Sequence, residues 1–188
     1  MFSNSKDNIK LLAAIRDKYL NIFAKKDEII NNSSQVLMSK NKGPSLYGMF
    51  FPNKEMNKYF HYKGTLVNNI DKCDFVYYFD NNDRLLLTIR KIENDNQDYI
   101  FYIYDVTRID VVWFSKKREK ITIVGTIEEK DKKLFRFLES FDIKNEVNSY
   151  KEYLFSEDMI TQRTYAQNFF LNNSDYESET SYKYVDGA

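Results

Sequence analysis

The chain has 188 residues, and its 28 Lys and Arg balance its 28 Asp and Glu, so its formal net charge is zero. A neutral chain of this length fits one ordinary domain and argues against a dedicated nucleic-acid-binding protein, which would carry a basic surplus. One cysteine, Cys73, excludes an intrachain disulfide and suits a reducing, cytoplasmic compartment. The apolar runs are too short for a secretion signal or a membrane-spanning segment.

The charge is unevenly distributed along the chain. Residues 1–63 carry 11 basic and 5 acidic residues, net +6, whereas residues 64–115 carry 5 and 9, net −4. Residues 116–145 carry 9 and 6, net +3, and residues 146–188 carry 3 and 8, net −5. Acidic and basic segments therefore alternate within a neutral chain.

The first element is predicted to be an amphipathic helix over about residues 7–30. Apolar residues at three- and four-residue steps form one stripe, which consists of Ile9, Leu12, Ile15, Tyr19, Ile22 and Phe23. The opposite face is basic, but Asp7, Asp17 and Asp27 interrupt it. We favour a helix that covers a sheet with its polar face in water. The alternative is a basic helix that lies on a membrane surface.

From about residue 45 to residue 170 the sequence changes to a period of two, which is the signal of half-buried strands. The clearest case is "KITIVGTIEE", where isoleucines alternate with lysine and threonines. Alternation or short apolar runs also occur in "SLYGMFF", "NKYFHYKG", "CDFVYYF", "RLLLTIRKI", "DYIFYIYDV", "RIDVVWFS", "NSYKEYLFS" and "MITQRTYAQNFF". We predict a strand in each of these stretches, and a polar loop at residues 31–45 before them.

Short polar connections join these strands, for example Asn81-Asn82, Val106-Thr107 and Lys116-Lys117-Arg118. A parallel crossover needs a dozen or more residues, so consecutive strands must be antiparallel. Asn and Asp tolerate positive φ, which explains how a chain with five glycines makes so many turns. The predicted fold class is therefore α+β and mostly β. It is a single domain, residues 1–188, with one large curved antiparallel meander sheet and an N-terminal amphipathic helix.

Two segments are ambiguous. In "DKKLFRFLESFDI" the apolar spacing predicts a second helix near residues 131–141, although Phe135 and Phe137 would also fit a strand. The tail at residues 171–188 is polar with spaced tyrosines, and it fits either an edge strand or a flexible end.

Residues with catalytic or metal-binding chemistry are sparse. His61 is the single histidine, it lies between aromatic residues, and no nucleophile-elbow motif accompanies it. His61, Asp71, Cys73 and Asp74 are potential metal ligands, but their spacing matches no zinc pattern. The five glycines form no phosphate-binding loop. We therefore predict a protein that is not an enzyme and holds no metal or cofactor.

The predicted sheet has a candidate protein-binding surface. "YIFYIYDV" cannot hide all of its aromatic residues on one side, and acidic residues lie near them. Aromatic anchors with a charged rim are typical of protein interfaces. The predicted partner-binding residues are Asp80, Asp83, Tyr102, Tyr104, Asp105, Asp110 and Glu152. The alternative is that helices or the sheet itself bury these aromatic residues.

Three serial hairpins, "YYFDNNDRLLLTI", "YIFYIYDVTRIDVVWFS" and "EYLFSEDMITQRTYA", follow an amphipathic helix in a compact chain. In this the chain resembles the small cytoplasmic immunity proteins of bacterial polymorphic-toxin and contact-dependent growth inhibition systems. The resemblance implies a protein that binds one cognate toxin, a nuclease in many systems, and blocks its active site. It also implies a contact face within the acidic residues 64–115. Many such proteins are acidic, whereas this chain is neutral, so the class of toxin stays open.

Two other functions fit the same sequence features. A curved sheet lined by the same tyrosines would suit a carrier of a small apolar or lipid-like ligand. A structural scaffold protein that contacts itself is the third reading.

Overall fold

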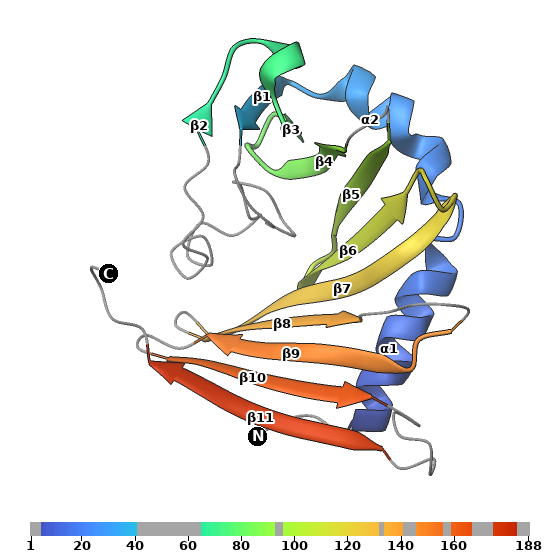
Figure 1. Cartoon of the computed structure of the whole chain (residues 1–188), viewed down its shortest axis with the longest axis vertical. Coiled ribbons are helices and arrows are strands. Elements are labelled where there is room, and N and C mark those ends of the chain that lie inside the picture. Colours follow the sequence, from blue (N-terminus) through green and yellow to red (C-terminus); the bar gives the residue numbers. More distant parts are fainter. Residues whose placement is uncertain are drawn as a thin grey trace. The chain divides into compact units, whose positions relative to one another are not determined.

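Most strands of the protein lie side by side in the order in which they occur along the chain (Figure 1). The computed structural model describes residues 5–40, 65–92, 96–131, 134–140, 146–155, 159–166 and 175–183. Its strands form one antiparallel sheet of 11 strands in the order β11-β10-β9-β8-β7-β6-β5-β4-β3-β1-β2. The prediction of a mostly β protein with an antiparallel meander is therefore confirmed.

The elements have the following bounds. The helical elements are α1 (Ser5–Lys18), the short 3₁₀ helix η1 (Ile22–Lys25), α2 (Lys26–Asn32) and η2 (Ile70–Lys72). The strands are β1 (Gln35–Lys40), β2 (Thr65–Leu66), β3 (Phe75–Phe79), β4 (Leu85–Lys91), β5 (Gln97–Tyr104), β6 (Arg108–Ser115), β7 (Lys120–Asp131), β8 (Leu134–Ser140), β9 (Ser149–Phe155), β10 (Met159–Ala166) and β11 (Tyr176–Lys183). Among the described helices, none is both long and apolar enough to cross a membrane.

Seven predicted strands coincide with β3, β4, β5, β6, β7, β9 and β10. The tail forms the edge strand β11, which was one of its two predicted states. The strands predicted in "SLYGMFF" and "NKYFHYKG" fall outside the described residues. The predicted polar loop at residues 31–45 is wrong in its first half, because β1 forms there and pairs with both β3 and β2.

The helix predicted near residues 131–141 is also wrong, because the segment forms strand β8. β8 pairs with β7 on one side and with β9 on the other, so Leu138 lies opposite both Thr126 and Glu152. The adjacent residues Phe137 and Leu138 are both buried, with 1% and 0% exposure. A strand covered on both faces has apolar residues on both, and this pattern imitates the spacing of a helix.

The N-terminal helix is shorter than the predicted range of 7–30. α1 ends at Lys18, a turn follows, and η1 and α2 form separate short helices. By the contacts between its residues, the chain forms two compact units, and Tyr19 and Leu20 lie on either side of their boundary. The first unit contains residues 1–19, 104–112 and 121–188, and the second contains residues 20–103 and 113–120. The helix therefore breaks where the chain passes from one unit to the other.

Gly125 on β7 lies opposite Glu139 of β8, at a position with no room for a side chain. A Cβ atom on Gly125 would lie 2.7 Å from the carbonyl oxygen of Leu138 and 3.3 Å from the ring of Phe137. The Phe137 ring also stacks on Tyr153, with 5.8 Å between the ring centroids. Only glycine leaves room for both contacts, because a backbone carbonyl in a strand cannot move aside.

We expect Gly125→Val to lower the free energy of unfolding by about 1–3 kcal/mol, because the added atoms overpack the β7–β8 pair. Urea denaturation measures the change. Thr126→Val is the matched neighbour: the Thr126 hydroxyl is buried and has no hydrogen-bond partner among the described residues. Its replacement by a methyl group should therefore leave stability unchanged or raise it. Equal losses in the two variants would contradict the close approach at Gly125.

Candidate functional site

Three of the seven predicted partner-binding residues lie in the protein interior. Tyr102, Asp110 and Glu152 are 3%, 1% and 1% exposed. Other aromatic residues of the same strands, such as Tyr99 and Phe101, are buried as well. These aromatic residues are therefore buried within the fold, as the alternative prediction stated.

The other four predicted residues form two turns. Asp80 and Asp83 lie in the β3–β4 turn of the second unit, and Tyr104 and Asp105 begin the β5–β6 turn of the first. Asp83 and Asp105 are exposed, whereas Asp80 and Tyr104 are half-buried. The structure thus brings Tyr104, Asp105 and the buried Asp110 together on one hairpin.

Asp80 builds its own turn. Its Oδ1 atom accepts hydrogen bonds from the backbone N–H groups of Asn82 and Arg84, both at 2.9 Å. Its Oδ2 atom accepts from Nε of Arg84 at 2.6 Å. Asp83 adopts a positive φ of 57° in the same turn. The sequence prediction that Asp makes a glycine-free turn is confirmed here, and the Asp80 carboxylate is occupied by that role.

The surroundings of Asp80 lower its pKa. Partial burial opposes ionisation, but the hydrogen bonds from the backbone and side chain of Arg84 and from the backbone of Asn82, together with the Arg84 charge, outweigh it. A depressed folded-state pKa means that ionised Asp80 stabilises the fold above the unfolded value of about 3.9. That contribution is lost as the pH falls through the lower, folded-state pKa.

We expect Asp80→Asn to lower the free energy of unfolding by about 1 kcal/mol at pH 7, because the partly exposed pair with Arg84 is lost. The difference from wild type should begin to shrink as the pH falls below the unfolded value of about 3.9. It should vanish once the pH is below the lower, folded-state pKa, where both chains lack the charge. Urea denaturation at a series of pH values measures both effects. A difference that stays constant down to pH ~2 would show that the charge of Asp80 has no stabilising role.

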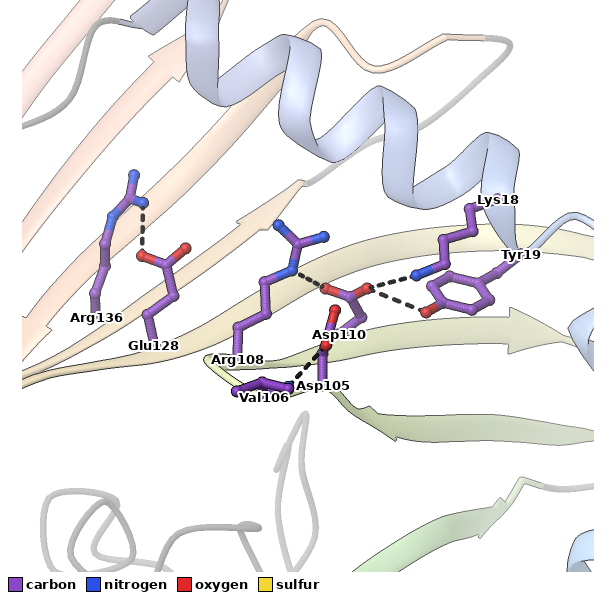
Figure 2. A network of polar contacts seen from close by, with 8 residues as sticks. All are labelled: Lys18, Tyr19, Asp105, Val106, Arg108, Asp110, Glu128 and Arg136. Atoms are coloured by element: carbon purple, nitrogen blue, oxygen red, sulfur yellow. Dashed lines mark hydrogen bonds and ion pairs between the residues drawn. The ribbon is translucent and has the colours of Figure 1, made fainter.

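A buried carboxylate joins the end of α1 to β6 (Figure 2). The Oδ1 atom of Asp110 pairs with Nε of Arg108 at 2.9 Å. Its Oδ2 atom accepts a hydrogen bond from the Tyr19 hydroxyl at 3.1 Å and lies 3.9 Å from Nζ of Lys18. Lys18 and Tyr19 stand at the C-terminal end of α1. Two cations and one hydroxyl therefore hold the charge of Asp110 inside the fold.

The pKa values in this cluster keep its protons in place. Burial raises the pKa of Tyr19, the neighbouring Lys18 lowers it, and the Asp110 carboxylate raises it again, so the net shift is upward. The pKa of Lys18 is raised by its hydrogen bond and charge interaction with Tyr19, and further by the carboxylates of Asp110 and Asp105. Near neutral pH both groups stay protonated, so Tyr19 donates a hydrogen bond to Asp110 and the Lys18 charge attracts the same carboxylate. The cluster therefore acts as an electrostatic clamp.

The β5–β6 turn, which directly precedes Arg108 and Asp110, presents an exposed tip, Asp105-Val106-Thr107. The Oδ1 atom of Asp105 accepts from the backbone N–H of Val106 at 2.7 Å (Figure 2). The backbone N–H of Asp105 donates to the Arg108 carbonyl at 2.9 Å. Val106 is 98% exposed, although it is apolar. The sequence prediction treated Val106 only as part of a connection. The sequence signal that could have drawn attention to Val106 is an apolar residue in an otherwise polar turn.

A second ionic cluster lies beneath α1 in the same unit. Arg136 on β8 donates through Nε to Glu152 at 2.5 Å, through Nη1 to Glu128 at 3.1 Å and through Nη2 to the Asn8 side chain at 2.6 Å. Asn8 belongs to α1, and Figure 2 shows the Arg136–Glu128 contact. The Tyr150 hydroxyl on β9 also donates to Ser5 at 3.1 Å. Arg136 was not among the predicted site residues, and its segment was predicted to be a helix.

We expect Arg136→Met to lower the free energy of unfolding by about 3–5 kcal/mol, because the buried Glu152 carboxylate loses its guanidinium partner. The double variant Arg136→Met/Glu152→Leu should recover part of that loss, since it removes both charges. Urea denaturation of both single variants and the double variant gives the coupling energy. A loss below about 1 kcal/mol for Arg136→Met would contradict the role of this pair.

Metal-ligand residues do not gather in the part of the chain that the structure describes, where no three His, Cys, Asp or Glu side chains cluster. Cys73 is buried, and its thiol donates to the Ile70 carbonyl at 3.1 Å. His61 falls outside the described residues.

Comparisons of the chain with protein-family models, curated proteins and solved structures found no match. Function is therefore inferred from the geometry of this chain. The feature with the clearest functional geometry is the Asp105-Val106-Thr107 tip on its clamped hairpin.

Proposed function

We propose that the chain is a non-catalytic, cytoplasmic protein-binding module that neutralises a bacterial toxin by covering its active site. The observation that carries this proposal is the β5–β6 tip, where exposed Asp105 and Val106 follow one another. The proposal also rests on the resemblance of the serial hairpins to immunity proteins. It places the contact in the acidic stretch of residues 64–115.

The tip is suited to binding because its conformation is fixed before a partner arrives. Asp105 is hydrogen-bonded to the backbone of Val106 and Arg108. Behind it, Asp110 ties β6 to the end of α1 through Tyr19. A preorganised turn on a rigid base loses little conformational entropy on binding, which favours affinity.

The chemistry of the tip suits a basic active site. The exposed Asp105 carboxylate attracts a positively charged surface and raises the association rate. Val106 supplies an apolar anchor that a pocket of the partner can bury. The half-buried Tyr104 adds aromatic area beside them. A nuclease that binds phosphates has a positively charged active site, so it is the kind of toxin that this tip fits.

Asp110 has a different role in this proposal from the one predicted for it. Its side chain is 1% exposed and is held by Arg108, so it supports the tip and does not touch the partner. A substitution of Asp110 would disturb folding and binding together. Asp105 and Val106 are therefore the residues that separate binding from stability.

A pull-down from the native cell with the tagged chain should recover the toxin, and co-expression should rescue cells from it. Asp105→Lys should then lower the association rate about tenfold, with a weaker effect at high salt. Val106→Asp should raise the dissociation rate about tenfold or more, because a buried anchor is lost. Surface plasmon resonance measures both rates.

Glu28→Lys is the matched control, since it makes the same charge change at an exposed residue of α2. It should leave both rates near the wild-type values. Wild-type kinetics for both tip variants would remove the tip from the interface. Failure of the chain to rescue cells from any recovered partner would overturn the function itself.

The carrier of an apolar ligand draws no specific support from the described residues. That reading needs tyrosines that line an open cup, whereas Tyr99, Tyr102 and Tyr150 are buried among the protein's own atoms. The curvature that the cup requires stays a prediction.

A further inference from the structure

The second compact unit carries a positively charged surface around Phe23. The Phe23 ring stacks on Phe114 with 4.4 Å between the ring centroids, and it makes a T-shaped contact with Tyr99 with 5.1 Å between the centroids. The Nζ atom of Lys26 lies 5.5 Å from the Phe23 centroid, and that of Lys116 lies 5.3 Å from it. Lysines from two distant parts of the chain thus converge on one aromatic ring.

Further cations adjoin these two lysines. Lys25 precedes Lys26, and the exposed β6–β7 turn continues from Lys116 into two more basic residues. The Phe23 patch, as we name it, comprises the aromatic residues Phe23, Tyr99 and Phe114 and the cations Lys25, Lys26, Lys116, Lys117 and Arg118. The acidic residues beside these cations in sequence are Asp27, Glu28 and Glu119, and Asp27 pairs with Lys26 at 3.1 Å. Five cations against three acids leave a local positive excess in a protein of zero net charge.

We infer that the Phe23 patch docks on anionic phospholipid headgroups at a membrane surface. Clustered lysines at a surface are attracted by the negative potential of anionic lipids. Leu20 begins the same segment and is 60% exposed, so it offers an apolar side chain that can enter the lipid interface. Membrane binding was the alternative prediction for the N-terminal helix. We assign that binding to the segment with η1 and α2 and not to α1. The inference does not rest on the proposed toxin partner.

The aromatic residues of the patch favour lipid over nucleic acid. Single-stranded nucleic acids bind by stacking bases on exposed aromatic faces. Here the Phe23 ring is already stacked on Phe114, and two lysines lie over it. Tyr99 is only 6% exposed. The patch therefore offers charge, and the adjoining Leu20 offers an exposed apolar side chain. Both suit an anionic lipid interface.

The test is co-sedimentation of the full chain with vesicles of phosphatidylcholine containing about 30% phosphatidylserine, compared with pure phosphatidylcholine vesicles. The wild-type chain should bind only the anionic vesicles and should be released by about 0.5 M salt. Lys116→Gln/Lys117→Gln/Arg118→Gln should weaken binding about 100-fold, at about fivefold per cation. Leu20→Ser should weaken it about tenfold while the salt dependence stays the same.

The control is Lys10→Gln/Lys40→Gln/Lys72→Gln, which removes three exposed cations outside the patch. It should bind as the wild type does, and circular dichroism should show all variants folded. An equal loss in this control, equal binding to neutral vesicles, or no binding to anionic vesicles would overturn the inference. Tighter binding to a single-stranded oligonucleotide, weakened by the same patch variants, would overturn it in favour of nucleic acid.

Discussion

The buried guanidinium of Arg136 is the constraint on which the first compact unit depends. It bonds at once to Glu152 on β9, Glu128 on β7 and Asn8 on α1. A buried cation that loses its acceptors is strongly destabilising, so these groups must stay together. One side chain therefore links strands β7, β8 and β9 to α1. Hydrophobic burial alone would allow the helix to slide, because it has no direction.

The same helix is held at its other end by Asp110, through Tyr19 and Lys18. With both ends tied to the sheet, α1 forms a rigid support for β6. This support matters for the proposed function, because it holds the exposed tip at Asp105 in one conformation. A flexible turn of the same composition would lose more entropy on meeting a partner, and its acidic and apolar side chains would bind less tightly.

The zero net charge of the chain conceals a local difference between these two surfaces. The tip presents an acidic group on the first unit, and the Phe23 patch gathers lysines on the second. The two surfaces therefore differ in local charge although the whole chain is neutral. An argument from net charge alone therefore says little about the partners of this chain, whereas the local potential decides which surfaces attract each other.

The sequence by itself determined the seven strands β3, β4, β5, β6, β7, β9 and β10, their antiparallel order and the Asp80 turn, because period-two alternation and short connections are local properties. Tertiary structure alone decided that β8 is a strand, that the first helix breaks near Tyr19, and that Asp110 and Glu152 lie inside. Burial of an acidic residue depends on which distant cation and which helix cover it. The local pattern around Glu152 contains no trace of Arg136, so exposure was the natural expectation from sequence, and only packing could reverse it.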